Sequence, residues 1–457
     1  MAKRIRPRER EAILTALSGG VTPRRGIQHI QVGRAEEIKS IIADIESISQ
    51  GDASCRIVSG PYGAGKTFFM QLCADMAVHK NLLVMNADLS PDRRLYASTQ
   101  DGSNKALNLY QALVRSIAST TRPNGGPEVL SDLLDSAAAK ISSADTSVRA
   151  DLQRLPYGFD AFKIVTEWQR ANEDLAMICT EKMSRDDLKA KRKVEDIKDS
   201  CLRWFNADIP LKTARDQLGV TGVITGDKSY DALKVIAALA VIGGFAGLFV
   251  ELDEFVNIWK INNTQSRDRN YEVVLRILNE SLQGDSHNIG FLIAATPQAI
   301  FDDRRGMASY EALASRLQSQ QVPGASQQTG IGPVIQLSPL SQEDLLVLLG
   351  NITNVDALGD KDAWKASNSD MEAFLKRFHD KLGADYYRTP REVIREWVAV
   401  LLAVGADPKL EISQAIGEAE INADQEGSVP QAPQRERNIA QGAGVTSKAP
   451  GASRFGF

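Results

Sequence analysis

The chain has 457 residues, of which 43% are apolar and 25% charged, a composition typical of a soluble globular protein with two or three domains. The formal net charge of −4 excludes the strongly basic balance of a nucleic-acid coat protein. The four cysteines are scattered without a C-x-x-C pair and there are four histidines, which argues against a structural zinc site and indicates a reducing, cytoplasmic location.

The N-terminal segment, 1–28, is basic and contains a predicted helix over 10–18. Its start, "MAKRIRPRER", is either a solvated tail or a contact for a phosphate backbone. It lacks the apolar core of a signal peptide.

Five short apolar runs are predicted strands, separated by helical segments. They cover 53–60, 81–90, 248–255, 289–297 and 332–340. Continuous apolar strands that alternate with helices indicate a mostly parallel sheet covered on both faces. The stretch between the second and third strands, about 101–231, is predicted to be a helical insertion. Within it, "SRDDLKAKRKVEDIKD" mixes acids and bases and is either a solvated helix face or a nucleic-acid or partner contact.

The most apolar stretch, 235–250, is too short to span a membrane, which needs about 20 residues. Gly243 and Gly244 interrupt it and "ELDE" follows it. We therefore expect a buried helix, a turn and a buried strand, and no membrane association.

The C-terminal part divides into helices, 339–421, and a tail, 422–457. Ser341 and Asp344 are spaced as a capping box at the start of the first helix. The tail is rich in Ala, Gly, Pro, Gln and Ser without periodicity, which predicts disorder. Its end, "SRFGF", is either a docking peptide or a frayed terminus.

The sequence "GPYGAGKT" satisfies G-x-x-x-x-G-K-[ST] between a predicted strand and a predicted helix. Its glycines let backbone N–H groups surround a phosphate, its lysine reaches the β- and γ-phosphate oxygens, and its threonine hydroxyl ligates Mg²⁺. We expect this loop to bind ATP with Mg²⁺ through these residues: Gly60, Gly63, Gly65, Lys66, Thr67 and Phe68.

The strand "GLFVELDEF" delivers Asp253 to the magnesium side of the phosphates. Glu254 beside it is the predicted base that orients and deprotonates an attacking water. An acidic pair here favours hydrolysis over simple binding.

Three later positions have two interpretations each. Thr296 follows the strand "FLIAA" and either senses the γ-phosphate or the attacking water, or caps its own backbone. Arg316 in "YEALASRL" is either a surface residue or an arginine finger for a neighbouring subunit. Arg391, at a helix start after Thr389-Pro390, could reach back to the phosphates, and Arg395 is the competing candidate.

The order of these parts resembles the AAA+ superfamily, in particular its origin-recognition and helicase-loader branch. The matching stretches are "VGRAEEI", "GPYGAGKT", "LFVELDEF", "AATP", "ASRL", "LSPLSQEDL" and "TPREVIREW". The chain is more closely similar to the BrxD-like ATP-binding proteins of bacterial BREX phage-defence systems. That likeness rests on "GVTPRRGIQHIQVGR", "YGAGKTFF", "ADLSPDRRLYA" and "ELDEF".

The resemblance implies an α/β P-loop core over 29–338, with the helical insertion inside it, and a helical lid over 339–421. It places Gly33 and Arg34 near the adenine, Thr296 as first sensor, Arg316 as finger and Arg391 as lid sensor. The insertion exceeds a minimal AAA+ core and we expect no winged-helix domain after the lid, which puts autonomous sequence-specific DNA binding in doubt.

Two functions fit these features. One is an ATPase that self-associates through Arg316 and acts on a DNA-associated complex or helicase in anti-phage defence, with DNA and other defence proteins as partners. The other is a slow nucleotide-gated switch that recruits partners. The set of Asp253, Glu254, Thr296, Arg316 and Arg391 favours the ATPase. A small-molecule kinase is disfavoured because no acceptor site is evident.

Overall fold

The computed structural model describes residues 5–97, 104–141, 146–178, 185–317, 332–382, 390–407 and 409–418. The predicted disordered tail over 422–457, its "SRFGF" end and Thr389 lie outside the described residues. None of the helices in these ranges combines the length and the apolar character that a membrane span requires.

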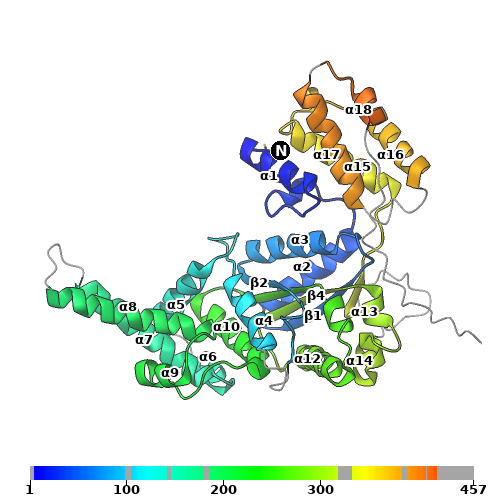
Figure 1. Ribbon diagram of the computed structural model, residues 1–457. Helices are drawn as coiled ribbons and strands as arrows, with labels where there is room; N and C mark the ends of the chain where they lie inside the picture. The colour runs from blue at the N-terminus through cyan, green and yellow to red at the C-terminus, as the bar shows by residue number, and fades with distance from the viewer. Residues whose placement is uncertain are drawn as a thin grey trace, which may run out of the picture. The chain divides into compact units, whose positions relative to one another are not determined.

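A parallel sheet forms the centre of the fold, as the apolar runs predicted (Figure 1). The strand order is β2-β3-β4-β1-β5, and each neighbouring pair is parallel. The strands are β1 Ala53–Ser59, β2 Leu82–Asp88, β3 Gly247–Asp253, β4 Ile289–Ala295 and β5 Val334–Gln336. In this order β1 and β3 flank β4, so the loops that follow β1 and β3 share one edge of the sheet. The architecture is consistent with a P-loop nucleotide-binding core.

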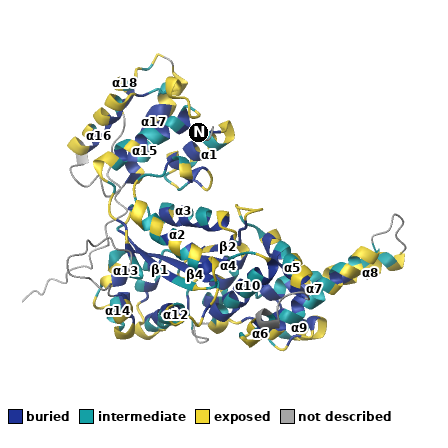
Figure 2. Cartoon of the chain, turned by 180° about the vertical axis from the view of Figure 1, so that it is seen from behind, coloured by how far each residue is buried: buried dark blue, intermediate teal, exposed yellow. Residues whose placement is uncertain are grey.

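Helices cover both faces of the sheet. On one face α2 (Ala35–Ser49) and α3 (Lys66–His79) pack on alternate strand residues such as Val84, Phe249 and Leu292. On the other face the remaining strand residues join a large apolar cluster with helices from the segment between β2 and β3. Strands β3 and β4 are buried at nearly every residue, and Figure 2 colours buried residues dark blue. The continuous apolar runs therefore reflect burial on both sides.

The segment between β2 and β3 is helical, as predicted, and it shares the core of the sheet. Its helices are α4 Lys105–Arg115, α5 Pro127–Ile141, α6 Thr146–Arg154, α7 Gly158–Ile178, α8 Arg185–Phe205, α9 Leu211–Leu218 and α10 Ser229–Gly243. Trp168 of α7 and Trp204 of α8 are buried in the same cluster as the strands. The most apolar stretch forms the end of α10, a turn at Gly244 (φ 94°) and β3, which confirms the expected helix, turn and strand.

The rest of the chain continues with helices on either side of β5. These are α11 Val256–Trp259, α12 Thr264–Gln283, α13 Pro297–Phe301 and α14 Glu311–Leu317, and then α15 Gln342–Asp356, α16 Asn368–Leu382, α17 Pro390–Ala406 and α18 Ile412–Glu418. Helix α15 begins at the predicted capping box: the Ser341 hydroxyl accepts from the Asp344 N–H, and the Asp344 carboxylate accepts from the Ser341 N–H.

The N-terminal helix α1 (Pro7–Ser18) belongs to the apolar core of the C-terminal helices. Its residues Ile13, Leu14 and Leu17 are buried in one cluster with α15, α16, α17 and α18. Arg10 also forms an ion pair with the buried carboxylate of Asp356 at the end of α15. The first described helix is therefore packed with α15 and α17, far along the chain.

Candidate nucleotide-binding site

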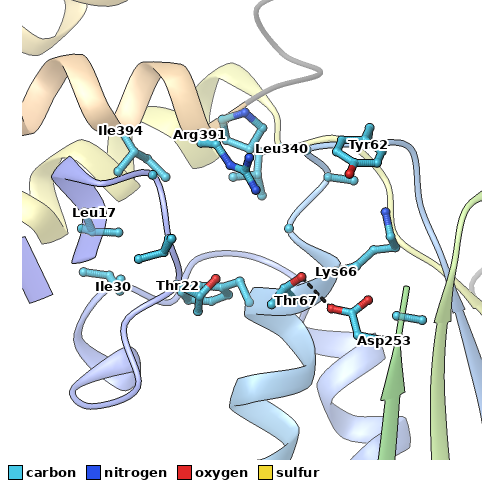
Figure 3. Close-up of a pocket in the computed structure, with 18 of the residues that line it drawn as sticks. Leu17, Thr22, Ile30, Tyr62, Lys66, Thr67, Asp253, Leu340, Arg391 and Ile394 are labelled. Atoms are coloured by element: carbon cyan, nitrogen blue, oxygen red, sulfur yellow. Dashed lines mark hydrogen bonds between the residues drawn. The ribbon is translucent and has the colours of Figure 1, made fainter. Parts of the chain in front are cut away.

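A pocket of about 180 Å³ lies where the loops after β1 and β3 meet (Figure 3). One wall is the phosphate loop and the start of α3. A second wall is the end of β3 with the residues that follow β4. A third is formed by the segment after α1 and by parts of α15 and α17. The pocket thus gathers residues that are far apart in the chain, from Leu17 to Ile394.

The phosphate loop wraps the first turn of α3 in a shape that needs glycine. Gly63 (φ 76°) and Gly65 (φ 81°) adopt left-handed backbone angles, and α3 begins at Lys66 directly after them. The Lys66 Nζ donates to the carbonyls of Gly60 and Pro61, each at 3.0 Å. Burial lowers the pKa of Lys66, while the negative charges of Asp253 and Glu254 raise it and so oppose that shift. The free N–H groups of the α3 start and the lysine make this loop an anion site.

On the opposite wall the acidic pair has a defined orientation. The Thr67 hydroxyl donates to Oδ2 of Asp253 at 2.8 Å, which Figure 3 marks as a dashed line. The Glu254 N–H donates to Oδ1 of the same carboxylate at 2.6 Å. The two bonds hold Asp253 beside the phosphate loop, with one oxygen directed to the threonine.

Glu254 has a left-handed backbone (φ 59°), which costs a non-glycine residue about 1 kcal/mol or more. This conformation directs the chain sharply out of β3 and places the carboxyl in the pocket wall. Burial raises the pKa of Glu254, and the neighbouring Asp253 raises it further. A carboxyl with a raised pKa is a stronger base than an ordinary surface carboxyl.

The oxygen atoms of Thr67 and Asp253 fit a magnesium ion. Magnesium prefers hard oxygen ligands and is usually held by one or two side chains, with phosphate oxygens and waters completing its coordination. A hydroxyl and a carboxylate within 2.8 Å of each other, beside a phosphate loop, offer that donor set. The residues present therefore suit the ion.

The other end of the pocket is apolar and suits a nucleobase. Its side chains come from α1, from the segments before α2 and α15, from α3 and from the C-terminal helices: Leu17, Ile30, Val32, Phe68, Leu340, Leu348, Ile352 and Ile394. Figure 3 shows Leu17, Ile30 and Ile394 gathered away from Lys66 and Asp253. The pocket therefore has an apolar end that suits the nucleobase and a polar end that suits the phosphates.

Arg34 and Gly33, which the resemblance places near adenine, occupy different environments. Arg34 lines the pocket and donates through Nη2 to the carbonyl of Ala64 in the phosphate loop. Its Nη1 is buried without a hydrogen-bond partner among the described residues. Gly33 lies against the start of α15, where an added Cβ would be 3.1 Å from Oδ1 of Asp344. The arginine is therefore the member of this pair that lines the pocket.

Of the candidate sensor and finger residues, Thr296 and Arg391 line the pocket and Arg316 does not. Thr296 lines the pocket, and its hydroxyl also accepts from the Ala299 N–H at 3.3 Å as the cap of α13, so both of its interpretations stay open. Arg391 lines the pocket at the start of α17, whereas Arg395 pairs with Glu392 at 2.7 Å outside the lining.

Arg316 lies away from the pocket of its own chain. Its side chain is exposed on α14 and donates to Oδ1 of Asn279 on α12 at 3.2 Å. Because it is absent from the pocket lining, it cannot act on the nucleotide of its own chain in this arrangement.

Sequence reasoning missed the contribution of the N-terminal segment. Residues Gly20, Val21, Thr22 and Pro23 line the pocket, and Gly20 lies against the Arg391 side chain. The basic composition of this segment gave no signal for that role. It also missed Asp88, which faces Asp253 across the β2–β3 pair, although the polar end of the second predicted strand was a weak indication.

The comparison with protein families decides the identity. The family described as BREX system ATP-binding protein BrxC/D matches residues 5–420. The chain belongs to this family. It is therefore an ATP-binding protein of the BREX phage-defence system, and the resemblance noted in the sequence is confirmed. No curated protein matches the chain.

Proposed function

We propose that this BrxC/D-family protein is a magnesium-dependent ATPase. The observation that carries the proposal is the arrangement around Asp253, which accepts from the Thr67 hydroxyl and from the Glu254 N–H. It combines a metal-ligand pair with an adjacent carboxyl of raised pKa in one pocket wall. A protein that only binds nucleotide has no need for the second carboxyl.

Each side chain has a defined task in this proposal. The Lys66 ammonium leaves the carbonyls of Gly60 and Pro61 and binds β- and γ-phosphate oxygens. Thr67 and Asp253 would hold Mg²⁺, which neutralises charge that develops on the phosphates. Glu254 accepts a proton from the attacking water. Thr296, in the same pocket, contacts that water or the γ-phosphate with its hydroxyl.

We further propose that the ATPase works as an assembly that acts on a DNA-associated complex or a helicase in defence. Arg316 is exposed and outside its own pocket, which supports a role as a finger for the nucleotide of a second copy. Arg391 joins the pocket from the C-terminal helices, which supports a role in sensing bound nucleotide.

The alternative is a slow nucleotide-gated switch that recruits other defence proteins. Two contacts favour it: the Thr296 hydroxyl accepts from its own helix, and Arg316 is held by Asn279. Both contacts would have to change before these residues take part in hydrolysis.

Steady-state ATP turnover with and without Mg²⁺, and with and without duplex DNA, tests the proposal. An ATPase gives phosphate release that requires Mg²⁺ and rises when DNA or a DNA-bound partner is added. Tight ATP binding with less than one turnover per hour under every condition would favour the switch.

A further inference from the structure

A second hollow lies beside the nucleotide pocket and shares Val21, Thr22 and Thr67 with it. It is open and wide, with a volume of about 1000 Å³. Its walls are the segment after α1, the first turns of α3, the end of β2 with the following loop, and α4. Helices α3 and α4 both pack against β2, from opposite faces of the sheet, and residues of both line the hollow.

Three arginines from three separate segments line this hollow, which we name the arginine groove. Arg24 follows α1, Arg93 follows β2, and Arg115 ends α4. All three are exposed, and among the described residues none of them makes a side-chain hydrogen bond or ion pair. Exposed arginines that converge from distant parts of the chain are available to an external anion.

The rest of the lining is polar. Gln71 and Asn86 present amide groups, and the apolar members of the lining are small: Val21, Ala87 and Ala112. Protein–protein interfaces usually have an apolar, aromatic centre, whereas nucleic-acid interfaces are polar and positively charged. Amide and arginine side chains are common donors to phosphodiester oxygens.

Two carboxylates oppose this positive charge. Asp92 is exposed in the groove. Asp88 lies on the magnesium side, where burial and then the charge of Asp253 raise its pKa, while Arg93 lowers it. The three arginines outnumber the two acids.

Helix α8 is the competing basic surface, and it is less suitable. Its exposed half carries Lys189, Arg192 and Lys193, but acidic residues are interleaved with them. Lys189 pairs with Asp186 at 3.5 Å, and Lys191 with Glu195 at 3.8 Å. The positive charge of this helix is therefore largely balanced along its own surface.

We propose that the arginine groove binds the phosphate backbone of a nucleic acid. This goes beyond ATP hydrolysis and does not depend on it, because the groove requires neither Glu254 nor turnover. Since Thr67 lines both hollows, a bound strand would lie next to the magnesium side of the nucleotide. Contacts to phosphates alone predict binding without strong sequence preference.

The test is direct binding of a fluorescein-labelled duplex, and of one of its strands, measured by anisotropy with and without ATPγS and Mg²⁺. The groove variant carries Arg24→Glu, Arg93→Glu and Arg115→Glu. A matched control carries Lys189→Glu, Arg192→Glu and Lys193→Glu on α8, which changes the net charge by the same amount. Losing three phosphate contacts should weaken binding on the order of 100-fold at about 0.1 M salt and reduce the salt slope by about 3.

The control should bind within twofold of the unaltered chain, and an Arg→Lys triple variant at the groove should keep most of the affinity. Thermal unfolding shows whether each variant folds; if the groove triple does not, Arg115→Glu alone should reduce the salt slope by about 1. The proposal is overturned if the unaltered chain binds neither form at low salt, which would leave an acidic protein segment as occupant. It is equally overturned if the α8 variant loses as much affinity as the groove variant. The ratio of duplex to single-strand affinity identifies the form that binds.

Discussion

Asp88 and Asp253 are the last residues of two neighbouring parallel strands and lie directly opposite each other in the β2–β3 register. Burial raises the pKa of Asp88, and the charge of Asp253 raises it further. Like charges placed side by side at the end of a sheet repel, and a bound magnesium ion would relieve that repulsion. Burial raises the pKa of Glu254 and both carboxylates raise it further, so the pair couples the charge at the end of β2 to the proposed base.

The first prediction concerns pH. Glu254 acts as a base only when it is ionised, so turnover should fall as the pH drops through its pKa, which burial and Asp253 raise above the ordinary value of 4.5. Asp88 also raises this pKa, so Asp88→Asn should shift the acid limb of the kcat profile to lower pH. Asp92→Asn, at an exposed position farther along the chain, serves as control. An acid limb that stays in place in Asp88→Asn would disprove the coupling.

The second prediction concerns the phosphate loop. Lys66→Ala removes the cation that reaches the phosphates and should weaken ATP binding by about 100-fold or more, as measured by calorimetry. Lys80→Ala, just after the other end of the same helix, removes an exposed lysine paired with Glu46 and should leave the affinity unchanged. Equal ATP affinity in Lys66→Ala and the unaltered chain would rule out this loop as the phosphate site.

The third prediction separates binding from hydrolysis. Glu254→Gln keeps the size and the hydrogen-bonding backbone of the residue but cannot accept a proton, so it should retain ATP and lose turnover by about 100- to 10,000-fold. Glu251→Gln is the matched control. Glu251 is buried within β3 and is absent from the pocket lining, so the amide should change turnover little. Turnover by Glu254→Gln at the unaltered rate would exclude this residue as the base.

The fourth prediction addresses assembly. If Arg316 completes the site of a second copy, chains with Arg316→Ala and chains with Glu254→Gln should each be inactive alone. When the two variants are mixed, part of the activity should return, because some interfaces between subunits bring an intact Arg316 to a site with an intact Glu254. Turnover is measured across mixing ratios, with light scattering to follow the size of the assembly. Absence of recovery at every ratio, together with a monomer in the presence of ATP, would favour the switch.

The fifth prediction distinguishes two arginines on one helix. Arg391 lines the pocket, so Arg391→Ala should lower ATP affinity or turnover. Arg395 pairs with Glu392 and Glu396, so Arg395→Ala should reduce the free energy of unfolding by about 1 kcal/mol and leave turnover nearly unchanged. Thermal unfolding and phosphate release on both variants check this. The opposite pattern would assign the sensor role to Arg395.

The fold and the shape of the candidate phosphate loop were predictable because their signals are local. The apolar strands are continuous runs, and Lys66 and Thr67 lie in one short motif whose position after a strand fixes its geometry. Asp253 and Glu254 were recognisable because the first ends an apolar strand and the second follows it directly. Each of these signals fits within about ten residues of sequence.

The remaining features depend on contacts between distant segments. Arg93 and Arg115 share one groove because α4 packs on β2, and Arg24 joins them from the segment after α1. No local pattern encodes this arrangement. The pairing of Asp88 with Asp253 depends on the strand register. The two interpretations of Thr296 stay open for another reason: capping a helix and lining a pocket are compatible roles for one hydroxyl.

The shared core of α1 and the C-terminal helices has a mechanical consequence. The residues just after α1 form one side of the nucleotide pocket, and Arg391 and Ile394 of α17 form the adjoining side. Because α1 packs against α15 and α17, a rigid-body movement of the C-terminal helices would displace the segment after α1 and the α17 residues of the pocket together. The nucleotide would then be enclosed by one unit built from the N-terminal segment and the C-terminal helices, and removing residues 1–23 would remove the N-terminal side of the pocket.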